Sequence, residues 1–160
     1  MRPRPPLPAA LASTCLAVAL AGCGAGGPVD LATDDLEPGA SQDCAALAAA
    51  LPRTLADRAR VESTGAPGAA YADGVTVRCG VPAPDALNPF STCQTVNGVD
   101  WYVPEEAIED QSADVVATTI SRTPAVELVV PGDLRPPAGA LAQLTDAVEE
   151  GTRRSGPACR

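Results

Sequence analysis

The sequence predicts an α+β fold of two layers, in which a mostly antiparallel sheet carries two helices packed on one face. Three features support this prediction: an apolar stripe at helical spacing, a central group of short β-branched runs, and a second helical stripe near the end. Strands grouped between helices, rather than alternating with them, are typical of antiparallel sheets. The 160 residues suit a single domain with a modest core, which we place at 43–151, with a tail at 152–160.

The first predicted helix begins near Asp43, and Ser41 or Asp43 can cap its amino end. Four residues recur at the spacing of one helical face: Cys44, Leu47, Leu51 and Leu55. Pro52 lies inside this pattern. Because proline lacks a backbone donor and clashes with the preceding turn, we expect the helix to break there and Pro52 to open a second short helical turn.

Five short segments then have the residue pattern of strands. They are 75–79, 94–96, 99–103, 115–121 and 125–130. Asn97-Gly98 predicts a hairpin between the second and third segments, because this pair accepts the two positive φ values of a type I′ turn. The last two segments predict either a second hairpin or one bent strand. Residues 65–70 are expected to form a loop.

The closing helix is predicted to run for about four turns, with Pro137 at its first position and Gly151 just past its end. Leu141, Leu144 and Val148 lie on one face of this helix and predict the side that packs on the sheet.

The amino-terminal residues have the pattern of an export signal. Arg2 and Arg4 precede the 13 uncharged residues 9–21, which as a helix would be about 20 Å long, short of a ~30 Å hydrocarbon core. Residues 20–23, Leu-Ala-Gly-Cys, resemble the lipobox of bacterial lipoproteins, in which the cysteine thiol is acylated before the signal is cut. The resemblance implies that 1–22 is removed and that Cys23 becomes the lipidated first residue. A plain secretory signal that ends near a cysteine is the alternative.

Residues 23–42 are predicted to form the lipidated amino terminus and a flexible spacer. The segment is rich in Gly, Ala and Pro, contains several acidic residues and has no apolar period. We therefore expect a protein anchored by lipid on the extracytoplasmic face of the cell membrane, since two acyl chains give stable anchoring.

The composition excludes several functional classes. The chain has 20 acidic and 11 basic residues, with no histidine. Binding to nucleic acid, or to an anionic membrane by charge, needs a basic face. The absence of histidine excludes Ser-His-Asp and Cys-His nucleophile pairs and histidine-ligated metals. We expect no cofactor and no nucleic-acid partner.

Four cysteines remain in the predicted domain and tail: Cys44, Cys79, Cys93 and Cys159. An even number in an exported chain predicts disulfides, and three connectivities are open. A zinc site is the alternative, but the chain has no Cys-x-x-Cys motif and no histidine. We expect no metal site.

Four motifs occur in order along the chain. They are Cys44-x-x-Leu47 followed by Leu51-Pro52, Val77-Arg78-Cys79-Gly80-Val81-Pro82, Gly98-Val99-Asp100-Trp101, and Arg122-Thr123-Pro124-Ala125-Val126. These motifs resemble the actinobacterial "domain of unknown function 3515" proteins over roughly residues 43–150. The resemblance implies a small, exported and often lipid-anchored protein, and it supplies no activity, ligand or catalytic residue.

This resemblance also favours one disulfide pairing. Cys44 and Cys79 both lie in the shared motifs, so we predict that they pair with each other. Cys93 and Cys159 then form the second bond, which would fix the tail.

Trp101, Asp100 and Arg122 are the candidate binding residues. Trp101 is either the core anchor of an aromatic-poor domain or an aromatic platform in a binding groove, with Asp100 or Arg122 near its rim. Arg122 is either a buried ion-pair partner of Asp100 or a surface hook for an anion. An acidic group is interpreted as a solvated connection, with calcium binding as the alternative. It consists of Glu105, Glu106, Glu109, Asp110 and Asp114.

Two functions stay open. We favour a non-catalytic interaction module of the cell envelope, which binds a protein or a wall component, because no catalytic constellation can be assembled. The alternative is an extracytoplasmic hydrolase or transferase that uses carboxylates alone. Carboxyl groups with raised pKa values around a deep pocket would favour the enzyme.

Overall fold

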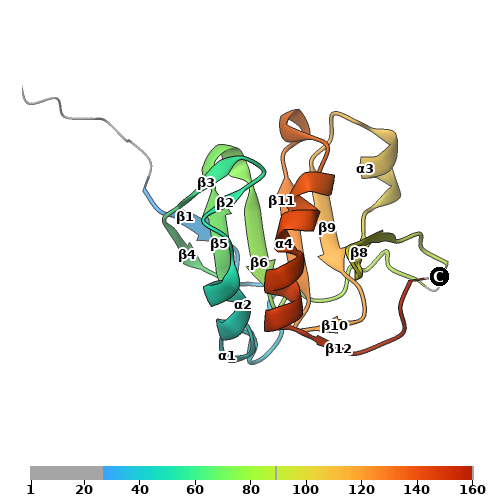
Figure 1. Cartoon of the computed structure of the whole chain (residues 1–160), viewed down its shortest axis with the longest axis horizontal. Coiled ribbons are helices and arrows are strands. Elements are labelled where there is room, and N and C mark those ends of the chain that lie inside the picture. The colour runs from blue at the N-terminus through green and yellow to red at the C-terminus, as the bar shows by residue number, and fades with distance from the viewer. Residues whose placement is uncertain (1–26, 89, 160) are drawn as a thin grey trace, which may run out of the picture.

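The computed structural model describes residues 27–88 and 90–159, and its centre is an eight-stranded sheet (Figure 1). The strands run across the sheet in the order β2 (Thr54–Leu55), β3 (Arg58–Val61), β5 (Gly68–Tyr71), β6 (Thr76–Cys79), β11 (Val126–Val130), β9 (Val115–Thr119), β8 (Val99–Tyr102) and β7 (Gln94–Val96). Every neighbouring pair is antiparallel. Together with the helices, this sheet confirms the predicted α+β fold.

Within the described residues, two short sheets and four α-helices accompany the large sheet. β1 (Val29–Leu31) pairs in parallel with β4 (Ser63–Gly65), and β10 (Arg122–Thr123) pairs antiparallel with β12 (Arg153–Arg154). The helices are α1 (Ala40–Asp43), α2 (Ala45–Ala50), α3 (Glu105–Glu109) and α4 (Ala138–Gly151), with 3-10 turns η1 (Ala72–Gly74) and η2 (Gly132–Leu134). Over residues 27–88 and 90–159, no helix has the length and apolarity needed to cross a membrane.

The longest helix, α4, lies against the large sheet and packs on α2 (Figure 1). Its apolar stripe is buried as predicted, with Leu141, Leu144 and Val148 in the main core. Gly151 closes the helix against Leu47 of α2, where an added Cβ would overlap the Leu47 backbone. This glycine therefore permits the close approach of the two helices.

The first predicted helix is divided in the structure. Cys44 separates α1 from α2, and α2 ends at Ala50. Leu51 is extended, with ψ 134°, because the residue before a proline is disfavoured in the helical region. Beyond Pro52 the chain enters β2, so the predicted second helical turn is wrong. Leu55 is fully buried, but it lies in strand β2 and not in a helix.

The predicted Asn97-Gly98 hairpin is confirmed. β7 and β8 pair on either side of these residues, whose φ values of 49° and 84° are the two positive values of a type I′ turn. The last two predicted segments form a hairpin too, because β9 and β11 are antiparallel neighbours. Residues 65–70 are not simply a loop, since they contain most of β5, which pairs with β3 and β6.

The predicted spacer is folded over most of its length. β1 pairs with β4, and Leu31 and Leu36 pack with Ala66 and Ala70 in a small second core. Burying these apolar side chains offsets the entropy of ordering the segment. The prediction of a flexible spacer is therefore wrong for 29–42, and the domain begins before residue 43.

Candidate functional site

Alternation along the central strands gives the large sheet two different faces. One face contributes Val77, Ala117, Leu128 and Trp101 to the core that α4 shares. Trp101 is fully buried there. It is therefore a core residue, and the alternative of an exposed aromatic platform does not hold.

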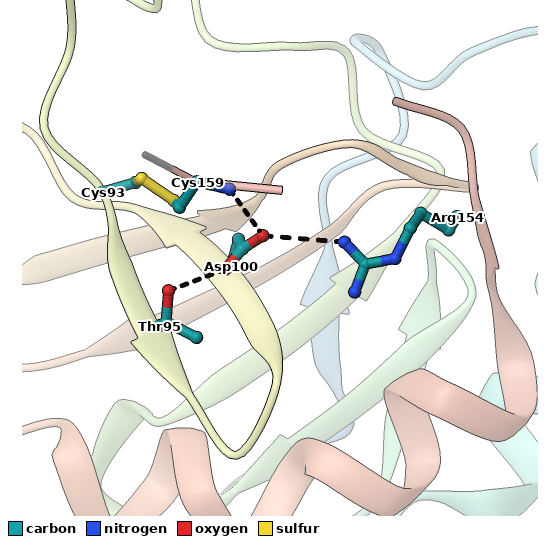
Figure 2. Close-up of a disulfide and its surroundings, with 5 residues drawn as sticks. All are labelled: Cys93, Thr95, Asp100, Arg154 and Cys159. Carbon is teal, nitrogen blue, oxygen red and sulfur yellow. Dashed lines mark hydrogen bonds and ion pairs between the residues drawn. A yellow bond between two sulfur atoms is a disulfide. The ribbon is translucent and has the colours of Figure 1, made fainter. Parts of the chain in front are cut away.

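Asp100 lies on the other face of β8 and holds the carboxyl-terminal tail (Figure 2). This residue is only 3% exposed. Its carboxylate accepts hydrogen bonds from Thr95 Oγ1 at 2.7 Å and from the backbone N–H of Cys159 at 3.0 Å. The Arg154 guanidinium lies 3.8 Å from the same carboxylate. Asp100 therefore fastens the tail to the hairpin of β7 and β8.

Arg122 does not pair with Asp100, and that prediction is wrong. Its guanidinium lies 3.7 Å from the Glu149 carboxylate and donates a hydrogen bond to Thr152 Oγ1 at 3.3 Å. The tail explains the difference, because β12 pairs with β10 and brings Arg154 to Asp100 in place of Arg122. Arg122 is thus a largely buried ion-pair residue, but its partner belongs to α4.

Both predicted disulfides are confirmed. The bond between Cys44 and Cys79 joins the junction of α1 and α2 to the end of β6, with 5.8 Å between the Cα atoms. The bond between Cys93 and Cys159 joins the residue before β7 to the tail, with 6.1 Å between the Cα atoms (Figure 2). The second bond and Asp100 hold the same end of the tail.

A row of polar side chains crosses the sheet face turned away from α4. Arg78 of β6 is in register with Glu127 of β11. Glu127 is in register with Thr118 of β9, and Thr118 with Tyr102 of β8. These four neighbouring strands therefore bring together residues that lie far apart in the sequence.

Arg78 is the centre of the charges in this row. It donates from Nε to Glu127 Oε1 at 2.9 Å, and from its terminal nitrogens to the Asp35 carboxylate at 2.7 and 3.0 Å. The hydrogen bonds from Arg78 lower the pKa of Asp35, and those bonds, with the one to Glu127, raise the pKa of Arg78. Asp35 therefore stays ionised at a lower pH than an unpaired aspartate does.

The row forms part of the floor of a cavity of about 340 Å³, which we call the open-face hollow. Its floor consists of Tyr102, Val116, Thr118 and Glu127, and its walls are residues 81–85, Pro104 and Asp35. Tyr102 is 7% exposed and Thr118 is 2% exposed. Neither side-chain hydroxyl has a hydrogen-bond partner among the residues that the structure describes. Both are available to a bound molecule.

A second hollow, of about 460 Å³, adjoins the first. The two cavities share Val81 and Ala83 as a dividing wall. The second cavity lies around residues 119–125, and Glu37 and Asp43 contribute acidic side chains to its lining. Arg122 also lines the second cavity, so its lining has mixed charge, whereas the charged residues that line the open-face hollow are Asp35, Asp85 and Glu127.

The acidic group after β8 forms a connection between β8 and β9. Glu105, Glu106 and Glu109 are exposed on α3. Asp110 accepts hydrogen bonds from Ser112, which lower its pKa, and Asp114 accepts one from the backbone N–H of Gly132 at 2.9 Å. Within the described part of the chain, no three His, Cys, Asp or Glu residues gather as metal ligands.

Comparison with known families gives one match. A family model described as "Protein of unknown function (DUF3515)" matches residues 6–155. The chain belongs to this family. The match includes the residues of both hollows, and it ends before Cys159 of the tail disulfide. None of the curated proteins and none of the solved structures matches this DUF3515 chain.

Sequence reasoning did not single out the open-face hollow of this DUF3515 chain. Thr118 and Glu127 are polar residues in mostly apolar strands, on the sheet face opposite the core that α4 shares. This polar pair is the one feature of the sequence that indicates the hollow. Only the strand order places them beside Tyr102. The predicted lipidation site, Cys23, lies within the family match but outside the described residues.

Proposed function

We propose that the chain is a lipid-anchored protein on the extracytoplasmic face of the cell membrane, and that its domain binds a partner in the cell envelope without catalysing a reaction. Arg2, Arg4 and the lipobox-like residues 20–23 support the anchor. The two disulfides are in keeping with export, because such bonds persist in oxidising compartments.

The open-face hollow is the observation that carries the proposal of binding. In this proposal the domain has two layers, with α2 and α4 packed on one face of the sheet and the other face left for a partner. The hollow lies on that second face and presents the hydroxyls of Tyr102 and Thr118. Both hydroxyls open into the cavity and have no hydrogen-bond partner among the described residues, so both can bond to a molecule that enters it.

A carboxylate-dependent hydrolase or transferase gains no support from this hollow. A general acid needs a carboxyl group whose pKa is raised towards neutrality. Arg78 instead lowers the pKa of Asp35 and donates a hydrogen bond to Glu127 at 2.9 Å. This arrangement favours fixed negative charges that attract a ligand.

A photo-crosslinking residue at Pro82, an exposed and uncharged position in the wall of the hollow, is expected to capture a specific envelope partner in intact cells. The same residue at Glu150, which is exposed on α4, is the matched control and should capture none. Mass spectrometry of the products identifies the partner and the linked peptide. Equal capture at both positions would contradict the proposal. So would turnover of an envelope component by the purified chain that is abolished by removing one carboxylate.

Replacing Cys23 with serine is expected to abolish the proposed anchor, because serine has no thiol to acylate. The wild-type chain should partition with membranes and show a diacylglyceryl adduct at Cys23 by mass spectrometry. The variant should appear in the soluble fraction or as uncut precursor. A Cys15→Ser variant is the control, since Cys15 lies in the predicted signal and should leave anchoring unchanged. An unmodified amino terminus beyond Cys23 in the wild type would refute the anchor.

A further inference from the structure

We infer that the open-face hollow receives a cationic side chain, an arginine or a lysine carried by a segment of the partner protein. This inference rests on the proposed binding function and specifies its ligand. Three features favour such a ligand: the charges around the hollow, the hydrogen-bonding groups of its floor, and the apolar walls together with the size of the cavity.

The charge of the hollow favours a cation. Asp35, Asp85 and Glu127 line it, and none of its lining residues in 27–88 and 90–159 is basic. The one guanidinium beneath it, Arg78, is already hydrogen-bonded to two of these three carboxylates. The remaining negative charge repels anions and attracts cations, and the formal net charge of −9 for the whole chain acts in the same direction.

The floor supplies hydrogen-bond acceptors. Arg78 donates from Nε to Oε1 of Glu127, which leaves Oε2 without a partner among the described residues. The hydroxyls of Tyr102 and Thr118 lie in the same floor, in register across β8 and β9. Guanidinium and ammonium groups are multiple donors without acceptor atoms, so they match a floor of one carboxylate oxygen and two hydroxyls.

The walls suit the apolar stem of such a side chain. Val81, Pro82, Pro84 and Pro104 form the walls, and Val116 contributes to the floor. Lysine and arginine bury their methylene stems against apolar surface while the charged end finds polar partners. A cavity of about 340 Å³ is near the lower end of the about 300–1,000 Å³ typical of ligand pockets. It therefore suits one side chain with its neighbouring backbone.

The test is a titration of the isotope-labelled full chain with the peptide N-acetyl-Gly-Arg-Gly-amide, followed by the NMR shifts of the backbone amides. Saturable shifts are expected at Tyr102, Thr118 and Glu127. The same peptide with citrulline in place of arginine has nearly the same shape without the charge, and it should bind at least tenfold more weakly. Raising the salt concentration should also weaken binding of the arginine peptide.

Two variants distinguish a loss of binding caused by the missing floor groups from a loss caused by unfolding. Glu127→Gln removes one charge, and the double variant Tyr102→Phe, Thr118→Val removes only the two hydroxyls while leaving Arg78 and its ion pairs in place. Each should weaken binding at least fivefold, with a melting temperature near that of the wild type for the double variant. Glu150→Gln on α4 is the matched control and should bind as the wild type does.

No saturable shift, equal affinity for the citrulline peptide, or wild-type affinity in the double variant would overturn the inference. The crosslinking experiment distinguishes this failure from failure of the proposed function. A partner captured from Pro82 through a segment without arginine or lysine would refute the cationic ligand and leave the binding function standing. Carboxylate-dependent turnover would refute the binding function even if the peptide occupied the hollow.

Discussion

Replacing Trp101 with alanine is expected to lower the free energy of unfolding by about 3–5 kcal/mol. Trp101 is the largest fully buried side chain and belongs to the core that α4 shares. The substitution removes its contacts and leaves a cavity that the surrounding strands and helix fill only partly. Urea denaturation followed by far-ultraviolet circular dichroism measures the loss, since the variant retains no tryptophan for fluorescence.

Phe90 provides the matched control for Trp101. It is 93% exposed, so Phe90→Ala should change the free energy of unfolding by no more than about 0.5 kcal/mol. A loss below about 1 kcal/mol for Trp101→Ala would show that the tryptophan does not anchor the core.

Replacing both Cys44 and Cys79 with alanine is expected to lower the free energy of unfolding by about 4 kcal/mol or more. The bond closes a loop with a sequence separation of 35, worth about 3.8 kcal/mol in the chain-entropy model. Both side chains are fully buried, so removing the sulfur atoms also costs packing. Urea denaturation of the double variant measures the total.

The double variant Cys93→Ser, Cys159→Ser is the comparison, because it removes the other bond at partly exposed positions. Hydrogen exchange should then increase along residues 153–159, while α2 and β6 stay protected. In the variant of Cys44 and Cys79, protection should fall in α2 and β6. The opposite distribution of exchange would contradict the roles assigned to the two bonds.

Elements with strong local signals could be predicted from the sequence. The hairpin of β7 and β8 depends on Asn97-Gly98, and α4 on an apolar stripe between Pro137 and Gly151. β5 has no such signal, because its Gly-Ala-Ala-Tyr sequence has little intrinsic strand preference and gains order by pairing with β3 and β6. β1 likewise depends on β4, more than thirty residues away.

The candidate site was harder to predict than the fold. The sequence singles out Asp100 and Arg122 as candidate binding residues or as an ion pair, but the path of the tail brings Arg154 to Asp100 and leaves Arg122 with Glu149. The open-face hollow depends on the non-sequential strand order β6-β11-β9-β8, which strand propensity does not encode. The shared family motifs predict the disulfide pairing, whereas cysteine spacing alone allows three connectivities.

Because the fold begins at β1, few residues would separate the folded domain from the lipid anchor, and the distance between the domain and the bilayer would be limited. If Cys23 carries the lipid, six peptide steps separate the anchor from Val29, the first residue of β1. Six steps of at most ~3.6 Å span about 22 Å, whereas a flexible spacer extending to residue 42 could have reached about three times as far. A domain joined to its lipid anchor by so short a segment stays in a thin layer next to the lipid headgroups. It would meet proteins and basic segments that lie on the membrane surface, and it could not search the more distant layers of the envelope.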